Sequence, residues 1–189
     1  MKTRIILTLC FFFCYQYTIG QDVVINTQET KKSIFADVFF GTQISGIRKE
    51  DRVSDNFTPY IQLTIGKQIF DLISLSVNYQ GPYFNFIGDD YRHHYAFIHG
   101  DVIFHIKDWL FPEKIPNWKV FIATGSGYFY NAHKASGSLA FNAGLINSYK
   151  ISSSLYLKLK LSGIGGWKIY QHDYDAIPNA SLGISKVFN

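Results

Sequence analysis

Hydrophobic and polar residues alternate one by one along much of this chain. In the stretch SLYLKLKLS, residues 154–162, leucine occupies every second position, and Tyr156, Lys158 and Lys160 lie between the leucines. An α-helix would distribute these leucines around its circumference, whereas a β-strand sends alternate side chains to opposite faces. The stretch therefore predicts a β-strand with one leucine face and one polar face.

Seven other segments resemble this one. In order along the chain they are residues 34–41, 60–66, 73–80, 95–104, 118–129, 138–148 and 180–188. The fifth of them is ambiguous, because neither of its faces is strongly apolar. Short and long connections nearly alternate, which is typical of an antiparallel up-and-down barrel. No segment after the first 20 residues has the hydrophobic spacing of an α-helix, so the pattern predicts an all-β fold of eight strands.

The first 20 residues have the pattern of a secretory signal peptide. A basic start is followed by an apolar run from Ile5 to Cys14 and by small residues before Gln21, and the run is too short to span a bilayer as a helix. Both cysteines of the chain, Cys10 and Cys14, lie in this leader, so we expect no disulfide after its removal. We expect residues 21–32 to form a periplasmic lead-in and residues 33–189 to form the barrel domain.

Composition excludes several classes of function. Charged residues make up 17% of the chain, against about 25% in ordinary soluble domains. The formal net charge of +4 falls to +2 when Lys2 and Arg4 leave with the signal peptide, which is too small to predict a nucleic-acid partner. The chain has no phosphate-binding glycine loop and no Cys/His cluster with metal spacing. We therefore expect neither a cofactor nor a metal.

The polar faces of the predicted strands carry mostly Ser, Thr, Asn, Gln and Gly. Faces in contact with bulk water usually carry many more charges, so these residues fit an enclosed lumen better. Eight strands close into a barrel whose interior is just filled by side chains. Closure also pairs the backbone N–H and C=O groups of the first and last strands, which would find no hydrogen-bond partner in hydrocarbon. The sequence thus predicts a closed eight-stranded antiparallel transmembrane β-barrel with its leucines toward lipid. The alternative is a soluble, secreted lipocalin-like binder with the leucines inward, around an apolar ligand.

Five titratable residues share the polar faces and would meet inside such a barrel. Lys158 and Lys160 need partners in a narrow, poorly solvated lumen. The alternation places Asp37 and Asp101 on the same inward face, so their carboxylates could supply these partners. His99 shares a face with Asp101 at a spacing of two residues. We expect a structural network of hydrogen bonds and ion pairs, with a proton-handling pair at His99 as the alternative.

Aromatic residues near the segment ends are expected to form girdles at the two membrane interfaces. The candidates are Tyr60, Tyr79, Tyr95, Phe104, Tyr128 and Phe188.

The chain resembles the small outer-membrane β-barrels of Gram-negative bacteria. The residues that carry the resemblance are LTIGK (63–67), VNYQGPY (77–83), YAFIHGDVIFHI (95–106) and the glycines of a G-x-G strand, Gly125 and Gly127. These motifs are similar to those of porin-type barrels of bacteroidete outer membranes, and the signal peptide, eight amphipathic strands and final aromatic strand are similar to the OmpA-like transmembrane domain. Two features depart from the pattern: no peptidoglycan-binding domain follows the barrel, and the last aromatic residue is penultimate.

The resemblance implies a location in the cell outer membrane and a structural or surface-interaction role. Outer-membrane lipid, the barrel-assembly machinery at the C-terminal strand and extracellular partners at the loops are the partners it implies. A lipid-modifying enzyme on the same barrel is the alternative. Such enzymes place a histidine and a serine two residues apart on one strand, whereas His133 and Ser136 are three apart and face opposite ways.

Overall fold

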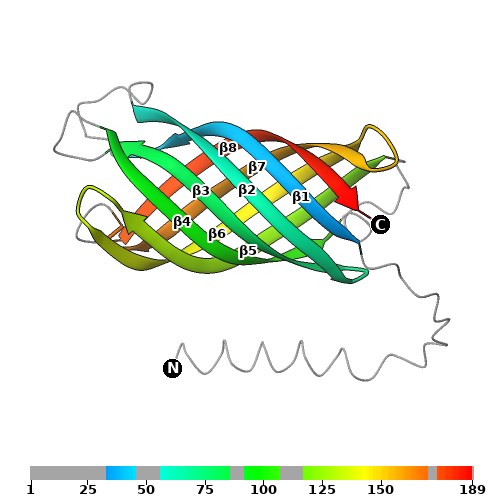
Figure 1. Ribbon diagram of the computed structural model, residues 1–189, viewed down its shortest axis with the longest axis horizontal. Coiled ribbons are helices and arrows are strands. Elements are labelled where there is room, and N and C mark those ends of the chain that lie inside the picture. Colours follow the sequence, from blue (N-terminus) through cyan, green and yellow to red (C-terminus); the bar gives the residue numbers. More distant parts are fainter. Residues whose placement is uncertain (1–32, 46–55, 86–91, 107–116, 170–173, 189) are drawn as a thin grey trace, which may run out of the picture. The chain divides into compact units, whose positions relative to one another are not determined.

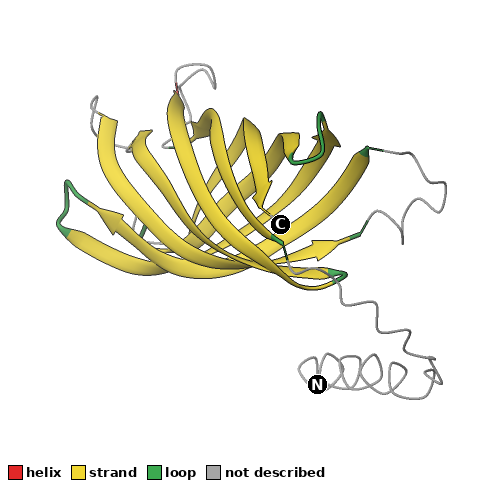
Figure 2. Ribbon diagram, turned by 45° about the vertical axis from the view of Figure 1, so that its right-hand side comes forward, coloured by secondary structure: helices red, strands yellow, loops and turns green. Residues whose placement is uncertain are grey.

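The computed structural model describes residues 33–45, 56–85, 92–106, 117–169 and 174–188, which form eight β-strands (Figures 1 and 2). The strands are β1 (Ile34–Ile44), β2 (Phe57–Phe70), β3 (Ile73–Asn85), β4 (Arg92–His105), β5 (Trp118–Asn131), β6 (Ser136–Lys150), β7 (Leu155–Trp167) and β8 (Tyr174–Phe188). The predicted signal peptide, residues 1–20, and the predicted lead-in, residues 21–32, lie outside the described residues. Within the described ranges, no helix is both long and apolar enough to cross a membrane.

Each strand pairs antiparallel with its neighbours in sequence, and β1 pairs with β8 to close the barrel. The predicted closed, eight-stranded, up-and-down fold is therefore confirmed. Ile34 of β1 lies opposite both Lys67 of β2 and Phe188 of β8. Strand β1 therefore begins, and strand β8 ends, at the same end of the barrel as the β2–β3 turn. We call this the terminal end of the barrel (at the right in Figure 1) and the opposite one the loop end.

Alternate side chains of each strand face into and out of the barrel. On β7, Leu157, Leu159 and Leu161 are between 43% and 51% exposed, whereas Lys158 and Lys160 are 9% and 1% exposed. The leucine face is thus the outer face, as predicted for a transmembrane barrel. A lipocalin-like arrangement, with the leucines lining an internal pocket, does not occur in this structure.

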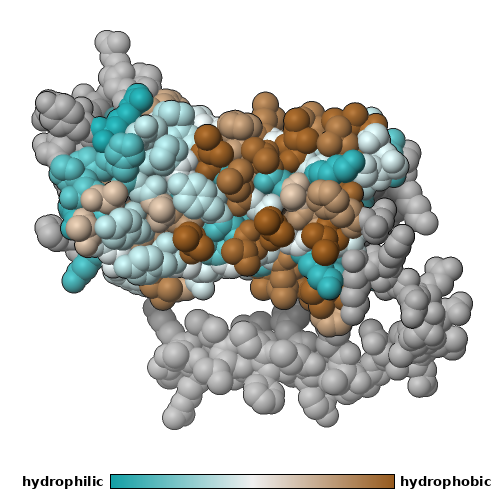
Figure 3. All heavy atoms as spheres, viewed as in Figure 1, coloured by the Kyte–Doolittle hydropathy of each residue, from teal (hydrophilic) through white to brown (hydrophobic). Residues whose placement is uncertain are grey.

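Several strands are longer than their alternating apolar segments, and most of the extra length lies at the loop end. The strand predicted over residues 60–66 begins at Phe57, and the strand predicted over residues 180–188 begins at Tyr174. The face of the barrel seen in Figure 3 is hydrophobic nearer the terminal end and hydrophilic at the loop end. The apolar alternation stops where the outer surface becomes polar, although the hydrogen-bonded strands continue.

Candidate functional site

The lumen of the barrel holds a network of buried polar side chains. Lys158 of β7 and Asp37 of β1 form an ion pair, with 2.7 Å between Nζ and Oδ2. The ammonium also lies 5.0 Å from the centre of the Phe35 ring. The two charged residues are 121 positions apart in sequence, and they meet because β8 closes the barrel between their strands. A buried ion pair needs such a close partner to offset the loss of hydration.

Lys160 is the most deeply buried lysine among the described residues, at 1% exposure. Its Nζ donates a hydrogen bond of 2.9 Å to Oε1 of Gln62 and lies 5.8 Å from the centre of the Phe39 ring. The Gln62 amide in turn donates to Thr64 and to Asn78. The sequence predicted a carboxylate partner for this lysine, and the hydrogen bond in the structure goes to an amide oxygen instead.

His99 and Asp101 form a second pair of titratable side chains in the lumen. Nδ1 of His99 lies 2.8 Å from Oδ1 of Asp101, and the Asn142 amide donates to the other carboxylate oxygen at 3.0 Å. The imidazole stacks on Phe97, with 4.3 Å between ring centres. The structure thus brings together the predicted histidine and aspartate, and adds an asparagine that sequence reasoning missed.

The G-x-G strand makes room for this group. Gly125 lies between Asp101 and Asn142 across the sheet, and Gly127 lies opposite His99. A Cβ at Gly125 would collide with the Asp101 carboxylate and the neighbouring backbone, and a Cβ at Gly127 would collide with Cα and Cβ of His99. The two glycines therefore explain how two bulky polar side chains fit beside β5, and they are the sequence signal that could have indicated the asparagine.

Two of the predicted interfacial aromatics, Tyr60 and Tyr95, lie inside the barrel at 1% and 3% exposure. Their assignment to the girdles was wrong. Each shares its parity with inward polar residues, Gln62 on β2 and His99 on β4, and the period of two outweighs the preference of tyrosine for interfaces. The Tyr60 hydroxyl lies 3.0 Å from the Asn179 side-chain oxygen, so this phenol is hydrogen-bonded within the lumen, as buried tyrosines usually are.

The other four candidate girdle residues face outward. Phe104 and Phe188 lie near the terminal end, opposite Ile73 and Ile34, whereas Tyr79 and Tyr128 lie further toward the loop end, each opposite Ile98. All four are at least 39% exposed. Their placement at the membrane interfaces remains a prediction.

An aromatic and aliphatic cluster fills the lumen toward the loop end. Its members are Phe84, Tyr95, Phe97, Phe129, Ala140, Ile164, Ile169 and Ile177. Tyr95 stacks on Phe129 with 4.8 Å between ring centres, and Phe84 packs edge-on against both rings. A barrel of eight strands has an interior of this width, which side chains fill.

The described residues contain no group of three or more His, Cys, Asp or Glu side chains placed to hold a metal ion. At the loop end, the His93 ring packs on that of His133, with 4.1 Å between ring centres.

Comparison with known proteins gives a match at the level of structure alone. No protein-family model and no curated protein sequence matches this chain. Among solved structures, neisserial surface protein A is similar, with a TM-score of 0.56 and 12% identity over 83% of this chain and 97% of that one. The N-terminal β-barrel domain of OprF from Pseudomonas aeruginosa gives a TM-score of 0.51 and 16% identity over 82% and 97% of the two chains.

Outer membrane protein H (OprH) from P. aeruginosa is also similar, with a TM-score of 0.50 and 16% identity over 82% of this chain and 99% of that one. At these identities the similarity concerns the fold. The chain has the fold of the small eight-stranded outer-membrane β-barrels, as the resemblance in its sequence implied.

Proposed function

We propose that this protein resides in the cell outer membrane, after export by its signal peptide, and has a structural or surface-interaction role. The observation that carries the proposal is the distribution of polarity. The outer face of the barrel is leucine-rich and exposed, and the buried inner face holds two lysines, three aspartates and many amides and hydroxyls. Water outside the barrel would disfavour this arrangement, and hydrocarbon favours it.

The first test of this proposal is membrane fractionation with gel migration. We expect the protein in the outer-membrane fraction and a compact band in detergent that shifts when the sample is boiled, because a closed barrel resists detergent until it is heated. Recovery in the soluble periplasmic fraction would contradict the location.

The orientation can be tested with single cysteines, because the exported part of the chain has none. We propose that the terminal end faces the periplasm and that the loop end faces the exterior. Ala132→Cys, in the exposed β5–β6 turn at the loop end, should react with an impermeant maleimide on intact cells. Asp71→Cys, in the exposed β2–β3 turn at the terminal end, should react only after the outer membrane is permeabilised. Labelling in the opposite order would invert the orientation.

The interior of the barrel favours a non-enzymatic role. The His99 side chain is fully buried, with Asp101 on one nitrogen and Phe97 stacked on its ring, so a lipid substrate has no access to the imidazole. A general base must come within hydrogen-bond reach of the group it deprotonates. Replacing His99 with Gln should therefore leave the composition of lipid A unchanged, and an altered lipid A profile in this variant would favour the enzyme.

Surface interaction is assigned to the loop end. The connections between β1 and β2, β3 and β4, and β7 and β8 all leave the barrel there. Exposed loops on a rigid sheet are the usual place for binding residues. Replacing the loop residues 46–55 by a short Gly/Ser linker should abolish binding to an extracellular partner while the heat-shifted band is retained, and binding that survives replacement of all three loops would exclude this surface.

A further inference from the structure

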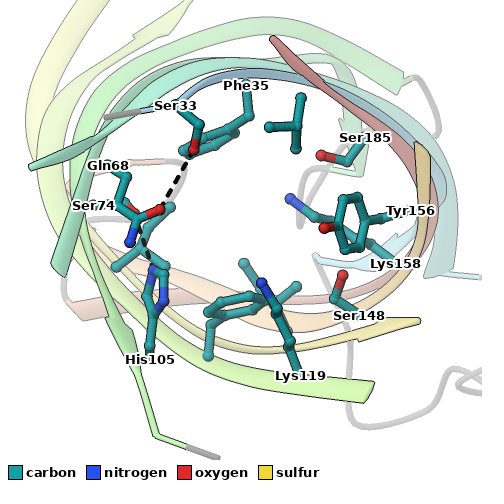
Figure 4. Close-up of a pocket in the computed structure, with 14 residues that line it drawn as sticks. Ser33, Phe35, Gln68, Ser74, His105, Lys119, Ser148, Tyr156, Lys158 and Ser185 are labelled. Atoms are coloured by element: carbon teal, nitrogen blue, oxygen red, sulfur yellow. Dashed lines mark hydrogen bonds between the residues drawn. The ribbon is translucent and has the colours of Figure 1, made fainter. Parts of the chain in front are cut away.

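The lumen opens into a cavity at the terminal end of the barrel (Figure 4). The volume of the cavity is about 100 Å³. One part of its wall is apolar and consists of Phe35, Ile103, Phe121, Ile146 and Val187. Another part is polar and comes from β5 to β8, with Lys119, Ser148, Tyr156, Lys158 and Ser185. A concave site with an apolar wall and a few convergent polar groups is the usual form of a small-molecule pocket.

Lys158 stands at the centre of the polar wall. One of its three N–H groups is used by Asp37, which leaves two for other acceptors. Ser148 on β6 lies directly opposite Lys158 across the sheet, and Ser185 on β8 lies directly opposite Asp37. The strand register therefore places the two serines beside the Lys158–Asp37 pair, and Figure 4 shows the side chains of Lys158, Ser148 and Ser185 directed into the opening.

Both serine hydroxyls are buried and have no hydrogen-bond partner within the described chain. Ser148 is 2% exposed and Ser185 is 1% exposed. Buried polar groups in folded proteins are nearly always satisfied, by protein, water or ligand. Two such hydroxyls beside a lysine that lines a cavity indicate that the cavity normally holds an acceptor.

The charge of the wall favours an anion. Lys119 lies at the mouth, exposed, with its Nζ 5.6 Å from the centre of the Tyr156 ring. The described residues that line the cavity include no aspartate or glutamate. Asp37 offsets part of the charge of Lys158 from outside the lining, and Lys119 adds a second ammonium group at the mouth.

We propose that this cavity binds a small organic carboxylate. The carboxylate oxygens accept hydrogen bonds from Lys158, Ser148 and Ser185, and the alkyl part lies against the apolar wall around Phe35 and Val187. Hydrogen bonds from an ammonium or hydroxyl group to a charged oxygen are the strong ones, and the low dielectric of a protein interior strengthens them further. The site goes beyond the structural or surface-interaction role and does not depend on which compartment the terminal end faces.

The test is titration of the full-length exported barrel in a zwitterionic detergent with three probes, followed by backbone NMR. Butyrate should bind saturably and shift the amides of Ser148 and Ser185. Butylamine has the same alkyl chain with the opposite charge, and inorganic phosphate has charge without an alkyl chain, so both should bind much more weakly. Equal binding of butyrate and butylamine, or no saturable binding of butyrate, would show a water-filled cavity and overturn the proposal. Equal binding of phosphate would overturn the assignment to an organic carboxylate.

The two serines supply the matched variants. The double substitution Ser148→Ala and Ser185→Ala should weaken butyrate binding by about tenfold or more, because two hydrogen bonds to a charged oxygen are lost. Ser138→Ala, on the same strand and facing the same way but near the loop end, should leave the affinity unchanged. The heat-shifted band verifies folding of each variant. An unchanged affinity in the double variant would place butyrate elsewhere and refute the site, while the proposed outer-membrane role would stand.

Discussion

Replacing Lys158 with Met tests the interior of the barrel most directly. The substitution keeps the length of the side chain and removes the charge from an ion pair whose side chains are 11% and 3% exposed. Asp37 then loses its partner at 2.7 Å, and its other oxygen already lacks a hydrogen bond within the described chain. Breaking a buried ion pair on one side costs roughly 3–5 kcal/mol.

The magnitude should lie at the lower end of this range, because Lys158 borders the open cavity and water can reach Asp37 once the ammonium is gone. We expect a loss of about 3 kcal/mol, which is a large part of the ~5–15 kcal/mol that stabilises a typical folded domain. The free energy of unfolding can be measured by urea titration of the barrel refolded into phospholipid vesicles, followed by tryptophan fluorescence and by the heat-shifted band.

A double variant and a surface lysine are the controls. Combining Lys158→Met with Asp37→Leu should recover most of the lost stability, because neither charge of this pair is then left without its partner. Lys67→Met, at an exposed outward position on β2, should change stability by no more than about 0.5 kcal/mol. If Lys158→Met unfolded at the same urea concentration as the wild type, the ion pair would be solvated and the enclosed lumen would be refuted.

Three further substitutions test other parts of the barrel. Gly127→Ala places a Cβ against β4 inside the lumen and should cost about 1–3 kcal/mol, whereas Gly100→Ala, where a Cβ meets only one atom at 3.8 Å, should be neutral in the same urea titration. Leu159→Arg, on the outer face, should cost about 2–4 kcal/mol in vesicles if that face contacts hydrocarbon, and an unchanged midpoint would argue against membrane contact. Tyr60→Phe removes the buried hydroxyl that bonds to Asn179 and Ser181 and should cost about 1–3 kcal/mol. Tyr79→Phe, on the outer face, should cost less, and equal losses would contradict the inward placement of Tyr60.

The contents of the lumen change along its axis. Toward the loop end, the rings of Phe84, Tyr95 and Phe129 pack against one another. The middle holds hydrogen-bonded amides and charges, and the terminal end holds the cavity beside Lys158. Among the described residues, the packed rings thus lie toward the loop end and the open cavity lies at the terminal end.

The number of strands and the face to which each side chain points could be predicted from the sequence, because both are local properties. A period of two fixes which side chains share a face whatever the strand pairs with, so SLYLKLKLS placed Lys158 and Lys160 opposite the leucines without knowledge of the fold. The same rule places Tyr60 and Tyr95 inside, where the structure has them. The error at these two residues came from giving a residue-type preference more weight than parity.

The partners inside the lumen were decided only by the tertiary structure. The alternation shows that Lys160 and Asp101 both point into the barrel. Their positions along the barrel axis, however, depend on the register of every strand pair around the closed barrel. That register places Lys160 against Gln62, and it places Asp101 against Asn142 across a glycine. The cavity at the terminal end likewise arises from eight strands at once, so no single segment of the sequence contains it.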